Sequence, residues 1–157
     1  MRYDPSHIIR VIPHRPPFLL IDAVESVEFG RQGVGVWTPD ASSEFIRDYR
    51  PGDNILPRTL LIEAMAQTAA FVAAGGSVFN SGTEPKSSAP PGVGYLVRLS
   101  DIVFSGDAKA GDTVSFIVEM SRSFGDLYKF TGRALVTGVE IARGELTFSV
   151  PRDSSSR

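Results

Sequence analysis

The chain has 157 residues and a formal net charge of −2, with 42% hydrophobic and 22% charged residues. This length suits one globular domain that removes roughly 70% of the unfolded chain's surface from water. The near-neutral charge predicts no nucleic-acid partner. The absence of cysteine excludes disulfides, a thiolate nucleophile and a cysteine zinc site. With two histidines and no tight carboxylate spacing, we expect no metal and no other cofactor.

The N-terminal segment, MRYDPSHIIRVI, does not have the features of a targeting sequence. It lacks the apolar run and the small-residue cleavage pattern of a signal peptide. No stretch of the chain approaches the about 20 uninterrupted apolar residues of a membrane span. We therefore expect a cytoplasmic protein without a membrane span.

The first part of the chain predicts a short helical turn and two strands. The turn covers Ser6–Val11. Apolar, β-prone residues at Phe18–Phe29 and again at Val34–Trp37 predict two strands joined by a turn at Gly30–Gly33. Residues 38–54 are polar and irregular and predict a shaped loop.

One long helix is predicted over Arg58–Gly76, RTLLIEAMAQTAAFVAAGG. It is apolar on every side, so other elements should wrap it completely. Pro57 should mark its start and Gly75-Gly76 its end. Within this apolar helix stands Glu63, with Gln67 one turn later on the same side. Because a carboxylate seldom enters an apolar environment without a partner or a purpose, Glu63 is the leading functional candidate.

The second part of the chain predicts a surface loop followed by antiparallel strands. The loop covers residues 77–92, which are rich in Ser, Pro and Gly. The four strands are Val93–Phe104, Thr113–Ser123, Leu127–Thr137 and Glu140–Val150, with turns at Gly125-Asp126 and at Gly138. This order indicates an α+β fold in which the sheet curls around the helix. Residues 1–150 should form a single domain and residues 151–157 a disordered tail.

Two stretches of the chain resemble a known family. PHRPPFLLID at Pro13–Asp22 and LPRTLLIEAMAQ at Leu56–Gln67 are similar to the signature stretches of the β-hydroxyacyl-acyl-carrier-protein dehydratases of fatty-acid synthesis. A weaker resemblance continues through Leu96–Asp112. The resemblance implies the hot-dog fold, a long central helix wrapped by a curved antiparallel sheet. It also implies homodimers joined by sheet pairing, sometimes assembled into hexamers, and a substrate carried on acyl carrier protein.

The chemistry that the resemblance implies is removal of water from a 3-hydroxyacyl thioester to give the 2-enoyl thioester. A base takes the α-proton, and the leaving hydroxyl receives a proton. In the family, a histidine of one subunit acts with the helix carboxylate of the other. Glu63 matches the carboxylate, but the histidine position falls on Tyr49, in Tyr49-Arg50-Pro51-Gly52. A phenol with a pKa near ~10 is a poor base at neutral pH, although it can donate a hydrogen bond.

The candidate catalytic residues are therefore Glu63 and Tyr49, and the candidate substrate-binding residues are Arg58, Gln67 and Gly52. Arg58 replaces a family glycine whose backbone N–H polarises the thioester carbonyl, and it keeps that N–H. Its side chain has three candidate destinations: it blocks the tunnel, pairs with Glu63, or meets an anionic group such as the phosphate of the carrier's arm.

Other residues and other functions compete with this interpretation. His14 is a candidate replacement base, but it belongs to the PHR segment, where the family also has its separate catalytic histidine, so a hydrogen-bonded loop role is favoured. Asp48 and Asp53 are more simply solvated turn residues. At Ser105-Gly106 the family often has basic residues, so the dock for an acidic carrier protein should be weaker. Two alternatives stay open: a catalytically impaired binding or scaffold subunit that pairs with an active homologue, and an acyl thioesterase in which Glu63 activates water.

Overall fold

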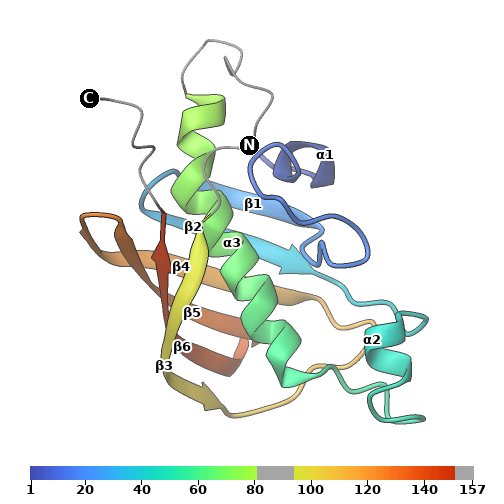
Figure 1. Cartoon of the computed structure of the whole chain (residues 1–157). Coiled ribbons are helices and arrows are strands. Elements are labelled where there is room, and N and C mark those ends of the chain that lie inside the picture. Colours follow the sequence, from blue (N-terminus) through green and yellow to red (C-terminus); the bar gives the residue numbers. More distant parts are fainter. Residues whose placement is uncertain (81–93, 151–157) are drawn as a thin grey trace.

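The computed structural model describes residues 1–80 and 94–150, which form a six-stranded antiparallel sheet around one long helix (Figure 1). The order of strands across the sheet is β1-β2-β4-β5-β6-β3. The strands are β1 (Ala23–Glu28), β2 (Gln32–Trp37), β3 (Tyr95–Phe104), β4 (Val114–Phe124), β5 (Leu127–Val136) and β6 (Val139–Ser149). The helices are α1 (Pro5–Ile8), α2 (Glu44–Arg47) and α3 (Arg58–Phe79). This is the α+β hot-dog architecture that the sequence predicts.

The central helix α3 packs directly against the backbone of the sheet. Glycines on two strands make this close approach possible. A Cβ atom on Gly35 of β2 would lie 2.2 Å from Thr68 Oγ1, and one on Gly132 of β5 would lie 2.3 Å from Met65 Sδ. Both distances are too short for a real side chain. Only glycine at these two positions therefore allows α3 to lie this close to the sheet.

The helix α3 has the length and composition of a membrane-crossing helix. However, 67% of its most apolar 18-residue window is buried inside the fold. The core helix of a globular domain has the same properties, because it too must be apolar on all sides. The surroundings of α3 are the sheet and the N-terminal segment, as Figure 1 shows.

The strand predictions for the second part of the chain are confirmed. Along β4, Val114, Phe116 and Val118 are buried and alternate with more exposed residues. The predicted hairpin turns also occur where the sequence placed them. Gly125 and Gly138 have φ values of 57° and 80°, a conformation that glycine adopts without a steric penalty.

The predicted end of the long helix is wrong. Instead of stopping at Gly75-Gly76, α3 continues to Phe79, with Asn80 as its C-cap. A Cβ atom on Gly75 would lie 2.3 Å from Phe29 Cε1, so this glycine lets the helix pass close to Phe29. Residues 77–79, predicted as loop, are therefore helical. The polar segment 38–54 also contains α2, which the loop prediction missed. The predictions for residues 81–93, including the first residue of the predicted strand Val93–Phe104, and for residues 151–157 lie outside the described residues.

Candidate functional site

A buried glutamine on α3 anchors the segment that precedes β1. Gln67 is 1% exposed. Its Oε1 accepts a hydrogen bond of 3.0 Å from the Leu20 N–H, and its Nε2 donates one of 2.8 Å to the Phe18 carbonyl. These bonds occupy backbone groups that a strand ladder would otherwise use, which explains why β1 begins at Ala23 rather than at Phe18 as predicted.

Glu63 lies one turn before Gln67 and receives two hydrogen bonds on the same oxygen. Gln67 Nε2 donates to Glu63 Oε1 over 3.0 Å, and His14 Nε2 lies 2.9 Å from that oxygen. The hydrogen bond from His14 is the main cause that holds the pKa of Glu63 below its ordinary 4.5. Burial opposes it, and the hydrogen bond from Gln67 adds to it. Glu63 is therefore ionised at neutral pH.

The other ring nitrogen of His14 has a different environment. Nδ1 is buried and has no hydrogen-bond partner among the residues that the structure describes. A proton on Nδ1 would be a buried donor without an acceptor, which costs about 1–3 kcal/mol. Nε2, by contrast, has Glu63 Oε1 as its hydrogen-bond acceptor.

A cavity of about 480 Å³ lies beside these three side chains. Glu63 and Gln67 contribute to its wall on α3, together with small residues of the same helix: Ala66, Ala70, Ala73, Ala74 and Ser77. From Glu63 to Ser77 the helix rises roughly 21 Å, at ~1.5 Å per residue. The facing wall includes the aromatic and aliphatic residues Tyr95, Leu96, Tyr128 and Phe148.

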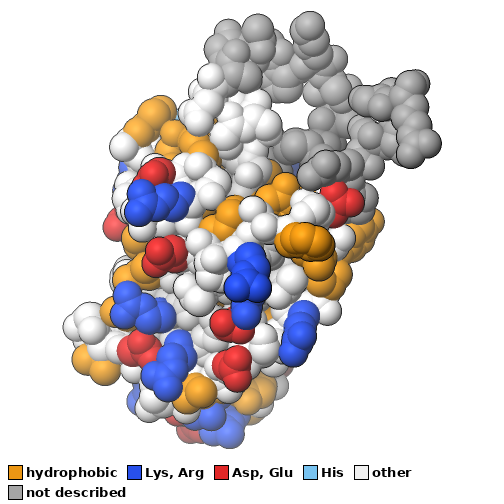
Figure 2. All heavy atoms as spheres, turned by 90° about the vertical axis from the view of Figure 1, so that its left-hand side faces the viewer, with side chains coloured by type: hydrophobic (Ala, Val, Ile, Leu, Met, Phe, Trp, Pro, Cys, Tyr) orange, Lys and Arg blue, Asp and Glu red, His pale blue; other side chains and the backbone are white. Residues whose placement is uncertain are grey.

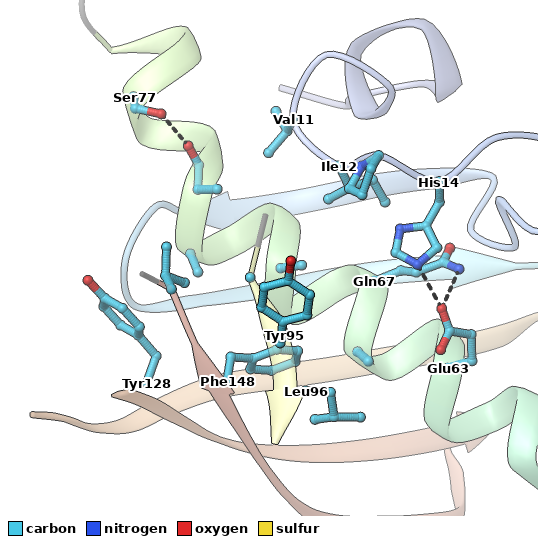
Figure 3. Close-up of a pocket in the computed structure, with 17 residues that line it drawn as sticks. Val11, Ile12, His14, Glu63, Gln67, Ser77, Tyr95, Leu96, Tyr128 and Phe148 are labelled. Carbon is cyan, nitrogen blue, oxygen red and sulfur yellow. Dashed lines mark hydrogen bonds and ion pairs between the residues drawn. The ribbon is translucent and has the colours of Figure 1, made fainter. Parts of the chain in front are cut away.

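The charged group sits at one end of this elongated apolar cavity. In Figure 3, His14 and Gln67 point toward Glu63 at one end, and Tyr128 lies at the other. The volume is within the range of small-molecule sites, which typically combine apolar walls with a few convergent polar groups. No group of three or more His, Cys, Asp or Glu side chains that could hold a metal ion occurs within residues 1–80 and 94–150. The polar groups at this end of the cavity are the Glu63 carboxylate and its two hydrogen-bonding partners, His14 and Gln67.

Arg58 does not occupy this cavity. Its Nε donates to Asp107 Oδ1 over 3.0 Å, and its guanidinium lies 5.4 Å from the centroid of the Phe104 ring. Of the three destinations considered for this side chain, blocking the tunnel and pairing with Glu63 do not occur within the described part of the chain. Arg58 opens the first turn of α3, where its backbone N–H has no acceptor within the helix.

The structure does not bring Tyr49 and Gly52 to Glu63 within one chain. Tyr49 is 49% exposed, and the Arg50 guanidinium lies 5.7 Å from its ring centroid. Gly52, with a φ of 92°, belongs to the turn between α2 and α3. Neither residue lines the cavity. The family resemblance implies that the two groups come from different subunits, so the roles of Tyr49 and Gly52 stay predictions.

The contact between His14 and Glu63 is the part of the site that sequence reasoning missed. The sequence predicts a replacement base or a hydrogen-bonded loop histidine at His14 but does not identify its partner. A signal was available, because the two residues lie in the two stretches that carry the family resemblance, Pro13–Asp22 and Leu56–Gln67. Two stretches that carry the signature of one family are candidates for contact in the fold. The sequence alone, however, does not give the distance between His14 and Glu63.

Together, the curved sheet, the central helix and the carboxylate at an acyl-sized apolar cavity define a hot-dog protein of the dehydratase class. The model of the ApeP-like family, described as ApeP dehydratase, matches residues 6–157. This chain belongs to the ApeP-like dehydratase family, which confirms the resemblance seen in the sequence.

Curated relatives of the chain are also dehydratases. The 3-hydroxyacyl-[acyl-carrier-protein] dehydratase FabZ of Gluconacetobacter diazotrophicus is 35% identical over 146 residues, covering 93% of this chain and 84% of that protein. FabZ of Thiobacillus denitrificans is 31% identical over 143 residues, covering 91% of this chain and 94% of that protein. The chain is therefore a dehydratase-like protein related to the 3-hydroxyacyl-acyl-carrier-protein dehydratases.

Solved structures agree on the fold. The dehydratase heterocomplex ApeI:P from Xenorhabdus doucetiae contains a chain with a TM-score of 0.74 at 20% identity, covering 94% of this chain and 92% of that chain. A hot-dog-like protein from Thermanaerovibrio acidaminovorans has a TM-score of 0.60 at 18% identity, covering 81% of this chain and 85% of that chain.

Proposed function

We propose that this protein eliminates water from a 3-hydroxyacyl thioester carried by acyl carrier protein and produces the 2-enoyl thioester. The observation that carries the proposal is the ionised Glu63 at the end of an apolar cavity. A carboxylate positioned in this way can exchange protons with a bound substrate. The relationship to FabZ supports the choice of a 3-hydroxyacyl thioester as that substrate.

The acyl chain is proposed to lie along the alanine face of α3, with its thioester toward the start of the helix. There the backbone N–H of Arg58, in the first turn, has no acceptor within the helix. The positive end of the helix dipole favours the negative charge that develops on the thioester oxygen. Arg58 would thus act through its backbone, while Asp107 holds its side chain aside. Gln67 would act by fixing Glu63 in place.

A dimer through the β3 edge is part of this proposal. Among the described residues, β3 is an end strand of the sheet, and an end strand offers its outer N–H and C=O groups to a second strand. It also exposes large apolar side chains: Tyr95, Leu96, Val97, Leu99 and Val103. Two of these, Tyr95 and Leu96, line the cavity as well. A partner on this edge would therefore cover the cavity and bring a second copy of the exposed turn that contains Tyr49 and Gly52 into the assembly.

The surface supports a weak dock for an acidic carrier protein. Lys129 Nζ lies 2.6 Å from Glu145 Oε2, and Arg143 Nη1 lies 3.3 Å from Glu140 Oε1. Basic and acidic side chains are interspersed over the face drawn in Figure 2. A carrier would meet a mixed field rather than a uniformly basic one, so we expect little electrostatic acceleration of its binding.

A cytoplasmic location is also proposed, and cell fractionation tests it.

A second candidate function is that of a subunit that works with a related chain. Tyr49 favours it, because a chain without an imidazole at this position could receive one from a homologous partner. The similar Xenorhabdus doucetiae protein was solved as part of a dehydratase heterocomplex. In this version, Glu63 would serve an active site completed by the partner.

Incubation of the purified chain with a 3-hydroxyacyl carrier protein, followed by mass spectrometry of the carrier, separates these functions. Loss of one water by the chain alone supports the proposal. Loss of water only after a related chain is added supports the second candidate. Release of the unacylated carrier indicates a thioesterase, and an unchanged carrier in both experiments refutes the dehydratase assignment. A gain in turnover for Tyr49→His would support its place at the family's histidine position.

A further inference from the structure

We propose that Glu63 performs both proton transfers of the elimination, and that His14 and Gln67 are positioning residues that hold it. This inference rests on the proposed dehydration and specifies how the chain would carry it out without the family's imidazole. It assigns to one carboxylate the work that the family resemblance divides between a histidine and a carboxylate.

The two oxygens of Glu63 have different surroundings. Oε1 accepts the hydrogen bonds from both His14 and Gln67. Oε2 has no hydrogen bond to any described residue, yet it is not among the buried side-chain atoms that lack a partner. It is therefore reachable from the space beside it, and Glu63 lines the cavity. One oxygen is fixed in place, and the other is free to accept a proton from a bound substrate.

His14 cannot take that proton in this arrangement. Its Nε2 is engaged with Glu63 Oε1. Its Nδ1 is buried, so a substrate in the cavity cannot reach it. The imidazole is better suited to donate one hydrogen bond from a fixed position, which orients the carboxylate and keeps it ionised.

No other titratable group in the described residues competes for this role. His14 is the only one that acts on the charge of Glu63. Arg15 donates to the backbone carbonyls of Ile12 and His14. The remaining titratable side chains nearby are Arg58, which pairs with Asp107, and the phenols of Tyr95 and Tyr128 on the facing cavity wall. A phenol is a poor base at neutral pH.

The reaction balances with one carboxylate. Glu63 Oε2 accepts the α-proton, and the electron pair of the broken C–H bond forms the double bond between the α and β carbons. The bond between the β carbon and its oxygen breaks, and the hydroxyl leaves with that electron pair. The hydroxyl then takes the same proton back from Glu63 and departs as water. The carboxylate is regenerated, and both transfers occur on one face of the substrate.

The pH dependence of kcat/KM for the chain alone tests this inference. A carboxylate base with a lowered pKa keeps its activity down to about pH 4.5 and loses it below that value. A histidine base would lose activity through about pH 6.5. The profile should be recorded over the range in which circular dichroism shows an intact fold. The wild-type profile requires no variant, so the test does not depend on a substitution that disturbs folding.

Variants at His14 separate positioning from catalysis. His14→Gln keeps an N–H donor, so it should lose less than about tenfold in kcat/KM, whereas loss of a general base typically costs 10²- to about 10⁴-fold. His14→Ala removes the donor that lowers the pKa of Glu63, so its acid limb should move to higher pH. His7→Gln is the matched control, because His7 pairs with Asp4 on α1 and does not line the cavity.

Three results would overturn the inference. An acid limb near pH 6.5, or a loss in His14→Gln as large as in His14→Ala, would make a histidine the base while leaving the dehydration intact. Turnover only after addition of a related chain would place the base on that partner. Absence of dehydration with or without a partner would refute the proposed function itself.

Discussion

Replacing Gln67 by leucine tests how the site is held together. The side chain makes three hydrogen bonds, to the Leu20 N–H, the Phe18 carbonyl and the Glu63 carboxylate. Leucine has a similar size, so the substitution removes the hydrogen bonds without opening a large void. One buried and one partly buried backbone group would lose their partner, and a charged acceptor would lose one of two donors. With about 1–2 kcal/mol for each of the three hydrogen bonds, the expected loss of unfolding free energy is about 3–6 kcal/mol.

Urea unfolding measures this loss directly. The midpoint should fall while the slope of free energy against urea stays unchanged, because the folded state remains as compact as before. Gln32→Leu is the matched control, since Gln32 is exposed on β2 and should change the stability by no more than about 0.5 kcal/mol. A loss below about 1 kcal/mol for Gln67→Leu would refute the view that Gln67 anchors the segment before β1.

Three further predictions address the packing, the charge and the assembly. Gly35→Ala should lower the unfolding free energy by about 1–3 kcal/mol, because its Cβ would lie 2.2 Å from Thr68 Oγ1. If urea unfolding shows no change in this free energy, β2 and α3 are not closely packed. The pKa of Glu63 is lowered on folding, so Glu63 stabilises the fold above pH 4.5 and loses this contribution as the pH falls through the lower folded value. The stability difference between wild type and Glu63→Gln should therefore shift in favour of Glu63→Gln below pH 4.5, and a difference independent of pH would contradict this. Leu99→Lys on the exposed edge of β3 should convert the proposed dimer to a monomer in sedimentation experiments. Val139→Lys, at a 63% exposed position on β6, is the control and should leave the dimer intact. If Leu99→Lys remains a dimer, pairing through the β3 edge is excluded.

The features that the sequence could predict are those governed by local patterns. The alternation of Val114, Phe116 and Val118 reports directly on one face of a strand. The all-round apolar character of α3 required a fold that wraps it. The same local reasoning misplaced the end of α3, because a glycine is used both to end helices and to allow close contacts. At Gly75 the deciding atom is on Phe29, far away in the sequence.

The site depended on contacts that no local pattern contains. Glu63 was recognisable because a carboxylate in an apolar helix is unusual. Its hydrogen bond with His14 and the bonds from Gln67 to the segment before β1 connect distant parts of the chain. The destination of the Arg58 side chain was open for the same reason, since its partner Asp107 lies beyond β3 in the sequence. Residue types therefore identified the candidate site residues, but their partners were determined by the fold.

The central claim is that Glu63 carries the chemistry of the cavity. Turnover of a 3-hydroxyacyl carrier protein by Glu63→Gln, compared with Glu25→Gln at an exposed position on β1, tests it most directly. Both variants remove one negative charge, but only the first changes the cavity. We predict a 10²- to about 10⁴-fold loss for Glu63→Gln and the wild-type rate for Glu25→Gln. Equal turnover by the two folded variants would contradict the claim.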